Sequence, residues 1–142
     1  MTTITHFEEK FGKIYYQENA DYYVIQPKGF LQIEQWETLL GAVLQLLMKK
    51  RFHKALADHT QMKLINKQAS DYIAQVFFPR AITLGLKRVA VVQPNDAFVE
   101  ITTEKVYDAA RDNSPDFIDA TFGSIEAAQN WLAKQKISSM AS

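Results

Sequence analysis

Three adjacent side chains, an acid, an imidazole and a hydroxyl, follow a short apolar run of strand length. The run is KALAD, residues 54–58, and the side chains are Asp58, His59 and Thr60. Ligands of open α/β sheets collect beyond the carboxyl ends of the strands, so these three residues are candidates for binding a ligand or partner. A hydrolase triad would need them within mutual hydrogen-bond reach. Because successive residues leaving a strand point to opposite faces, we expect Asp58 to order the loop and His59 to lie in solvent.

Arg80, in the segment FFPRA, is a fourth candidate. Its guanidinium could hold a carboxylate or phosphate as a fork, although an ion pair with an acidic neighbour is the commoner use of a helix-surface arginine. The five glycines stand too far apart for a phosphate-binding loop. The three histidines, His6, His53 and His59, lack the spacing of a metal-binding pair. We therefore expect no catalytic residue, no metal and no cofactor.

Two aromatic doublets suggest a contact surface. Tyr15 and Tyr16, and again Tyr22 and Tyr23, are consecutive in two short strand-like runs. Side chains alternate along a strand, so each doublet places one ring on each face of a hairpin. One face can pack under helices, and the other could be an exposed aromatic surface that mediates homodimerisation. A sheet covered on both sides is the alternative, and the sequence leaves both possibilities open.

The elements that must position these residues follow from apolar periodicity. The runs KIYYQ from residue 13 and YYVIQ, joined by ENAD, predict a hairpin that ends at Gly29. Apolar residues then recur every three or four positions from Ile33 to Leu47, which predicts an amphipathic helix packed on the sheet. Residues 54–58 predict a strand. A second helix runs from Ala69 toward Gly85, a residue suited to a left-handed cap, with a kink or a new helical segment at Pro79.

The second half of the chain continues the alternation of helix and strand. RVAVV, residues 88–92, reads as a strand at the centre of the sheet, covered on both faces. Asn95 or Asp96 could cap a third helix with Phe98, Ile101, Val106 and Ala109 inward. Residues 116–122 predict a last strand, and Ser124 opens a last helix whose core-facing residues are Ile125, Ala128, Trp131 and Leu132. The predicted class is α/β, with a mixed, mostly parallel sheet of about five strands.

Composition narrows the setting. The chain has 142 residues and a formal net charge of +0, so no bulk field attracts nucleic acid. It has no cysteine, no basic and apolar leader and no apolar run of membrane-spanning length. We therefore expect one cytoplasmic domain over residues 1–142, without membrane insertion, with an ordered core over about 12–136 and a flexible tail at 137–142.

Four stretches carry a family resemblance: KGF at 28–30, LADHT at 56–60, FFPRAITLGLKRVAVVQP at 77–94 and FGSIEAAQNWL at 122–132. Together they resemble small bacterial stand-alone proteins with the STAS or SpoIIAA-like fold, over roughly residues 12–135. The resemblance implies a leading hairpin, then alternating helices and strands, and a non-enzymatic regulatory module that acts on an unknown protein partner.

In the anti-sigma-factor antagonists of this fold, phosphorylation of a serine acts as the switch. Here Asp58-His59-Thr60-Gln61 stands where the Asp-Ser-Ser/Ala-Gly turn would be, so a kinase-operated switch is not expected. The CRAL-TRIO lipid-binding domain, related in architecture, suggests the alternative. In that reading, a small apolar or anionic ligand binds in a cleft near Asp58, His59, Thr60 and Arg80.

Overall fold

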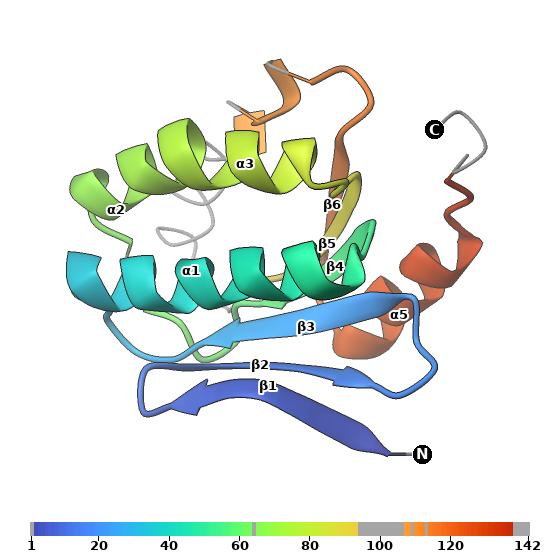
Figure 1. Cartoon of the computed structure of the whole chain (residues 1–142), viewed down its shortest axis with the longest axis horizontal. Helices are drawn as coiled ribbons and strands as arrows, with labels where there is room; N and C mark the ends of the chain where they lie inside the picture. Colours follow the sequence, from blue (N-terminus) through green and yellow to red (C-terminus); the bar gives the residue numbers. More distant parts are fainter. Residues whose placement is uncertain (1, 64, 94–106, 109, 113, 138–142) are drawn as a thin grey trace.

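Six strands form one mixed sheet in the order β1-β2-β3-β4-β5-β6 (Figure 1). The computed structural model describes residues 2–63, 65–93, 107–108, 110–112 and 114–137. The strands are β1 (Thr3–Glu9), β2 (Gly12–Gln17), β3 (Tyr22–Pro27), β4 (Lys54–Asp58), β5 (Arg88–Val92) and β6 (Ile118–Phe122). The pairs β1–β2 and β2–β3 are antiparallel, and β3–β4, β4–β5 and β5–β6 are parallel. The expected α/β class with a mixed sheet is confirmed.

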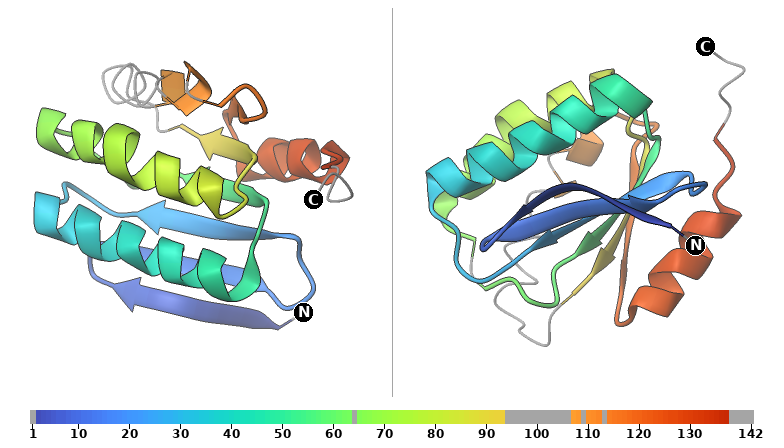
Figure 2. Two further views of the ribbon diagram at one scale, coloured as in Figure 1. Left: turned by 45° about the horizontal axis from the view of Figure 1, so that its top comes forward. Right: turned by 60° about the horizontal axis from the view of Figure 1, so that its bottom comes forward.

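Helices lie on both faces of this sheet (Figures 1 and 2). One face carries α1 (Ile33–Lys50) and a second helical run made of α2 (Lys67–Tyr72), η1 (Ile73–Phe77) and α3 (Phe78–Thr83). The opposite face carries α5 (Ile125–Lys134), which packs on β4, β5 and β6. No helix of the described residues is both long and apolar enough to cross a membrane.

The leading hairpin is β2 and β3, as the aromatic doublets predict. Strand β1, which pairs with β2, was not expected. The sheet therefore has one strand more than predicted, and this strand lies before residue 12, where the ordered core was expected to start. The sequence of β1, TITHFEE, alternates only weakly between apolar and polar residues, and the register of its pairing with β2 shifts between Thr5 and Phe7. At this irregularity, His6 Nε2 donates a hydrogen bond of 2.8 Å to the carbonyl oxygen of Ala42 in α1.

The predicted amphipathic helix is α1, and its apolar face forms the largest part of the core. Seven of its side chains are buried: Trp36, Leu39, Leu40, Ala42, Val43, Leu46 and Leu47. Each large apolar side chain removed from water in this way contributes about 1.5–3 kcal/mol. The helix begins with Gln35 Oε1 accepting a 2.8 Å hydrogen bond from the backbone of Gln32, and it ends at Arg51 in the left-handed conformation.

Pro79 lies in the first turn of α3, which confirms the second of the two alternatives predicted for it. Proline has no backbone N–H and crowds the preceding turn. The chain accommodates it with one wide turn, η1, in which the Phe78 N–H bonds to the carbonyl of Ile73, five residues back. The run ends at Gly85, whose φ of 113° confirms the expected left-handed position.

The last elements follow the prediction with two corrections. Strand β5 is covered on both faces, but it lies one strand from the sheet edge rather than at the centre. The Ser124 side chain caps α5, and Ala128 and Leu132 are fully buried. Ile125, expected in the core, is 42% exposed because the first residue of the helix lies at the rim of the α5 layer.

The expected third helix lies mostly outside the described residues. This is the case for Asn95, Asp96, Phe98, Ile101, Val106 and Ala109. Residues 107–108 and 110–112 are helical, and Tyr107 and Ala110 are buried.

Close packing of β2 on α1 gives a first prediction. A Cβ on Gly12 would lie 2.9 Å from Leu39 Cδ2, and Leu39 is fully buried. We expect Gly12→Ala to lower the free energy of unfolding by about 1–3 kcal/mol through overpacking. Gly41→Ala, in the interior of α1 with nothing within 4 Å of the added carbon, should raise it by about 0.5–1 kcal/mol. Urea denaturation measures both; an unchanged Gly12→Ala midpoint would contradict the close contact.

Candidate functional site

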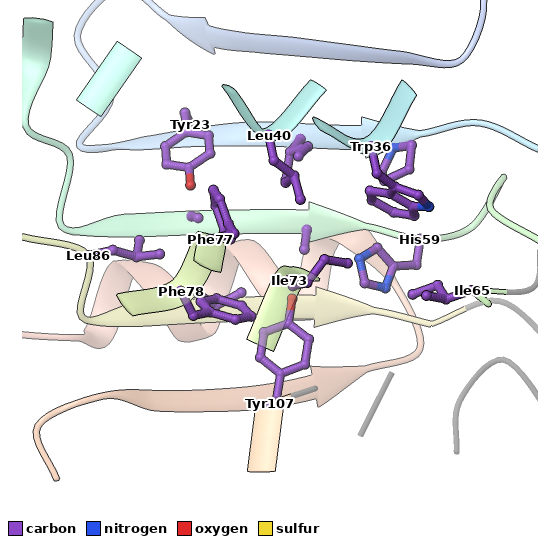
Figure 3. Close-up of a pocket in the computed structure, with 15 residues that line it drawn as sticks. Tyr23, Trp36, Leu40, His59, Ile65, Ile73, Phe77, Phe78, Leu86 and Tyr107 are labelled. Carbon is purple, nitrogen blue, oxygen red and sulfur yellow. The ribbon is translucent and has the colours of Figure 1, made fainter. Parts of the chain in front are cut away.

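A cavity of about 50 Å³ lies between the sheet and the two helical runs above it (Figure 3). Strands β3, β4 and β5 form its floor, and α1, η1 and α3 supply its roof and walls. Its lining is mostly aliphatic and aromatic, with contributions from Tyr23, Trp36, Ile73, Phe77 and Phe78. His59, from the segment that the sequence singles out, also lines it.

The topology brings Trp36 and His59 to one end of this cavity. Strands β3 and β4 are parallel, so their carboxyl ends meet at the same edge of the sheet. Trp36 lies in the first turn of the helix that follows β3, and His59 directly follows β4. The loops after the two strands are tied together by hydrogen bonds from Gly29 N to Gln61 O, 2.8 Å, and from Lys63 N to Gly29 O, 2.9 Å. In Figure 3 both rings lie toward one end of the cavity, and Tyr23 and Leu86 toward the other.

The expectation that His59 lies in solvent is wrong. Its backbone N–H donates to Val92 O at 2.9 Å, which extends the pairing of β4 with β5 by one residue. The alternation of side chains therefore continues through His59 and directs its ring to the face of the sheet under α1 and η1. His59 is 6% exposed there. Burial lowers the pKa of His59 from 6.5 to about 4, partly opposed by the negative charge of Asp58. The imidazole is neutral at pH 7.

Two polar atoms in the cavity lining have no hydrogen-bond partner. These are Nδ1 of His59 and Nε1 of Trp36, and both are buried. Trp36 is 3% exposed, so water at the molecular surface does not reach its indole N–H. Buried polar atoms in folded proteins are nearly always paired with protein groups or ordered water, so these two atoms are positions where a water molecule or a ligand would form a hydrogen bond.

Asp58 orders the following loop, as expected. It is 1% exposed, and its Oδ1 accepts hydrogen bonds from Thr60 N at 3.0 Å and Thr60 Oγ1 at 2.6 Å. Its Oδ2 accepts a third hydrogen bond, from Gln26 Nε2 at 2.8 Å. The Asp58 carboxylate thus bonds to Thr60 and Gln26. The imidazole of His59, which lies between Asp58 and Thr60 in the sequence, points to the opposite face of the sheet. The three residues do not form a proton relay.

The structure does not bring Arg80 to these residues. It is exposed on α3, where it borders an open groove with Met48 of α1 and Leu84. Sequence reasoning also missed Trp36, Ile73, Phe77 and Tyr107 as site residues. Trp36 fits the helical spacing of the apolar residues in α1, and Ile73 and Phe77 are four residues apart in the second helical run. This spacing is also typical of ordinary core residues. No group of three His, Asp or Glu side chains that could hold a metal ion occurs in the described part of the chain.

The tyrosine doublets divide between the two faces of the sheet. Tyr16 and Tyr23 are buried and pack against the ring of Phe52, with centroids 5.3 and 5.8 Å away, so they are excluded as surface contacts. Tyr15 and Tyr22 lie half-buried on the face that carries α5. Tyr22 Oη accepts a 3.2 Å hydrogen bond from Gln129 Nε2, and the Lys13 ammonium lies 5.0 Å from the Tyr15 ring centre.

This second face is covered only in part. Helix α5 packs on β4, β5 and β6 and reaches β3 at Tyr22 and Val24, and it leaves the same face of β2 outside its cover (Figure 2). A hollow of about 110 Å³ lies at the boundary, bordered by Tyr15, Tyr22, Ile125 and Gln129. The face is therefore neither fully exposed nor fully covered, an arrangement between the two alternatives that the sequence leaves open.

Comparison with known proteins identifies the fold. No protein-family model matches the chain, and no curated protein matches its sequence. Solved structures match over most of its length. The unphosphorylated anti-sigma factor antagonist SpoIIAA has a TM-score of 0.60 at 12% identity, covering 89% of this chain and 99% of that chain. The protein TM1081 has a TM-score of 0.61 at 16% identity, covering 92% and 94%.

A third match is an uncharacterised protein of the DUF3478 family from Shewanella loihica, with a SpoIIAA-like fold. Its TM-score is 0.52 at 19% identity, covering 85% of this chain and 91% of that chain. At such low sequence identity, these structural likenesses establish the fold alone. The chain has the SpoIIAA-like fold that the sequence resemblance predicts.

The buried imidazole gives a pH prediction. Between about pH 4 and pH 6.5 the unfolded chain binds a proton at His59 that the folded chain excludes, so stability falls as pH falls through this range. From pH 7.5 to pH 5 the expected loss from this residue is about 2 kcal/mol. His59→Leu should remove that part of the pH dependence in urea denaturation.

His6→Gln is the matched control, because it leaves His59 in place and should lose stability with falling pH as the unmodified chain does. Titration of the His59 ring by NMR, with an expected midpoint near pH 4, checks the same point without a substitution. Parallel loss of stability in His59→Leu and the unmodified chain would contradict the burial of a neutral imidazole.

Proposed function

We propose that this chain is a non-enzymatic, cytoplasmic module that works by protein–protein contact, and that one of its partners is a second copy of itself. The main support is the likeness to SpoIIAA, an anti-sigma factor antagonist, which extends over 99% of that chain. A fold alone does not determine a function, so the proposal also needs a surface that could make the contact.

The surface is the part of the sheet that α5 leaves uncovered, which we call the tyrosine face. It consists of the partly exposed residues of β2 and β3 that point to the α5 side, which are Lys13, Tyr15, Gln17, Tyr22 and Gln26; Val24 points the same way but is buried. All five are only half-buried. Tyrosine is enriched at protein interfaces because its ring supplies apolar area and its hydroxyl remains able to hydrogen-bond.

Charge favours a second copy as the occupant. The chain has a formal net charge of +0, so two copies meet without the bulk repulsion that keeps highly charged proteins apart. On the neighbouring strand pair, Glu8 lies opposite Lys13 in the β1–β2 register. The tyrosine face thus combines two rings with balanced charge, and the hollow beside Tyr22 offers space for a partner side chain.

The geometry of residues 58–60 argues against a different class of function, a hydrolase that uses His59. A nucleophile and its base need to lie within hydrogen-bond reach. The Thr60 hydroxyl donates to Asp58, and the imidazole lies on the other side of the sheet among apolar side chains. This geometry supports a binding role for His59 rather than a catalytic one, and a loop-ordering role for Asp58 and Thr60.

Analytical ultracentrifugation tests the self-association. At micromolar concentration we expect a mass near twice the 16.3 kDa of this chain. Tyr15→Arg should weaken the dimer by about tenfold or more, because it places a charge at the centre of the contact. Met48→Arg, a similar substitution on the helical side at a residue 59% exposed, is the control and should leave the dimer intact. A monomer at all concentrations, or equal effects of both substitutions, would refute the tyrosine-face dimer.

A second candidate function, a small-ligand binder, is favoured by one observation: the cavity with two unpartnered polar atoms. The site differs from the cleft expected from the sequence, because Arg80, Asp58 and Thr60 do not line it. Small-molecule sites are typically apolar with a few placed polar groups, which describes this lining.

Native mass spectrometry of the protein purified without denaturant tests this second candidate. We expect an added mass that is lost when the same sample is denatured, because the cavity exists only in the folded chain. Equal masses under both conditions, in protein never exposed to dialysis, would count against an endogenous ligand in the cavity.

A further inference from the structure

The cavity beneath the α2–η1–α3 run restricts the chemistry of what it can hold. Its two free polar atoms, Trp36 Nε1 and His59 Nδ1, lie on walls from different elements, the first turn of α1 and the residue after β4. The indole N–H can only donate a hydrogen bond, whereas a neutral imidazole nitrogen donates or accepts according to its tautomer. A group that satisfies both atoms must therefore accept from the indole.

Size is the second restriction. A water molecule needs about 10–15 Å³ of cavity volume. A cavity of about 50 Å³ therefore holds on the order of four waters, or a molecule with about as many heavy atoms. Pockets for drug-sized ligands start at about 300 Å³. The structure thus accommodates a short apolar body with one polar head, and not a nucleotide or a long acyl chain.

Charge is the third restriction. The described lining contains no Lys, Arg, Asp or Glu side chain, and its one titratable base is neutral at pH 7 because burial lowers the pKa of His59. Burying an ion without a countercharge is strongly unfavourable. An uncharged head meets the two hydrogen-bonding atoms without that penalty.

We propose that this cavity binds a small uncharged molecule with a hydroxyl or carbonyl head and a short apolar body, the head bonding to Trp36 Nε1 and His59 Nδ1. The inference rests on the second function proposed above and specifies its ligand class. It is independent of the tyrosine face, which lies on the other side of the sheet.

The wide turn η1 forms part of the roof of the cavity. Ile73 and Phe77, its first and last residues, both line the cavity from above. Wide turns of this kind interrupt the regular helix ladder and occur often at functional sites. The part of the roof formed by Ile73 and Phe77 is therefore the part with the least regular backbone pairing.

A titration with four probes of similar size tests the ligand class. The probes are 1-butanol, butyramide, butyrate and butylammonium, added to the full chain at pH 7.5. NMR follows the indole N–H of Trp36 and the side-chain methyl groups of Ile73. Trp131, which packs against Phe122 at a centroid distance of 5.8 Å on the opposite face, is an internal control for general solvent effects.

We expect saturable shifts at Trp36 and Ile73 with 1-butanol and butyramide, and binding at least about tenfold weaker for the two charged probes. Trp36→Phe keeps the ring and removes only the N–H, so it should weaken 1-butanol binding by about fivefold, the effect of one hydrogen bond. His59→Leu should weaken it similarly. Trp131→Phe should have no effect. The Ile73 methyl groups provide the measurement in the variants.

Three outcomes would overturn the proposal. Equal, non-saturating shifts at Trp36 and Trp131 would mean that the cavity takes up water only, and the second proposed function would fail as well. Tighter binding of butyrate or butylammonium would refute the uncharged head and leave a ligand-binding cavity. Unchanged affinity in both Trp36→Phe and His59→Leu would show that these atoms do not bind the head.

Discussion

Alternation of side chains along β4 separates two chemistries that are adjacent in sequence. Lys54, Leu56 and Asp58 point to the α5 face, and Ala55, Ala57 and His59 to the face under α1. The parallel pairing with β3 and β5 fixes this register, and a slip of one residue would exchange the two sets. Every feature of the candidate site depends on it, because the same register places the carboxylate in the loop network and the imidazole in the cavity.

The two faces also differ in how their buried polar groups are satisfied. On the α5 face, the buried Lys54 ammonium bonds to Asp21 at 2.7 Å and to the carbonyl of Leu132 at 2.8 Å. At the other end of the strand, Asp58 accepts three hydrogen bonds. On the cavity face, His59 Nδ1 and Trp36 Nε1 have none. The buried charges on the α5 face thus have partners, whereas the two neutral polar atoms that line the cavity have none.

Much of the fold could be predicted because local patterns and tertiary packing agree. The β2–β3 hairpin, α1 and the capped α5 each combine a clear period with a recognisable turn or cap. Strand β1 could not be predicted in this way: its Thr and Glu residues are exposed at a sheet edge, and the irregularity after Thr5 breaks the alternation. An edge strand stabilised by pairing rather than by burial leaves little trace in an apolar pattern.

The candidate site was predictable only where local geometry decided it. Asp58 orders its loop through the nearby Thr60, an interaction between residues two positions apart, and sequence reasoning found it. The burial of His59 depends on its pairing with Val92 and on the roof from η1, both distant in sequence. Trp36 fits the apolar periodicity of α1 whether or not its indole N–H has a hydrogen-bond partner. Periodicity alone therefore cannot distinguish a site residue from a core residue at this position.

An unpaired buried polar atom costs about 1–3 kcal/mol, and the whole stability of a domain is typically about 5–15 kcal/mol. Two such atoms in one cavity are therefore a large cost relative to what holds the chain folded. Phenylalanine at position 36 and leucine at position 59 would avoid it and still supply apolar surface. Trp36 and His59 are best explained if something that the chain encounters in its folded state forms the two missing hydrogen bonds and offsets that cost.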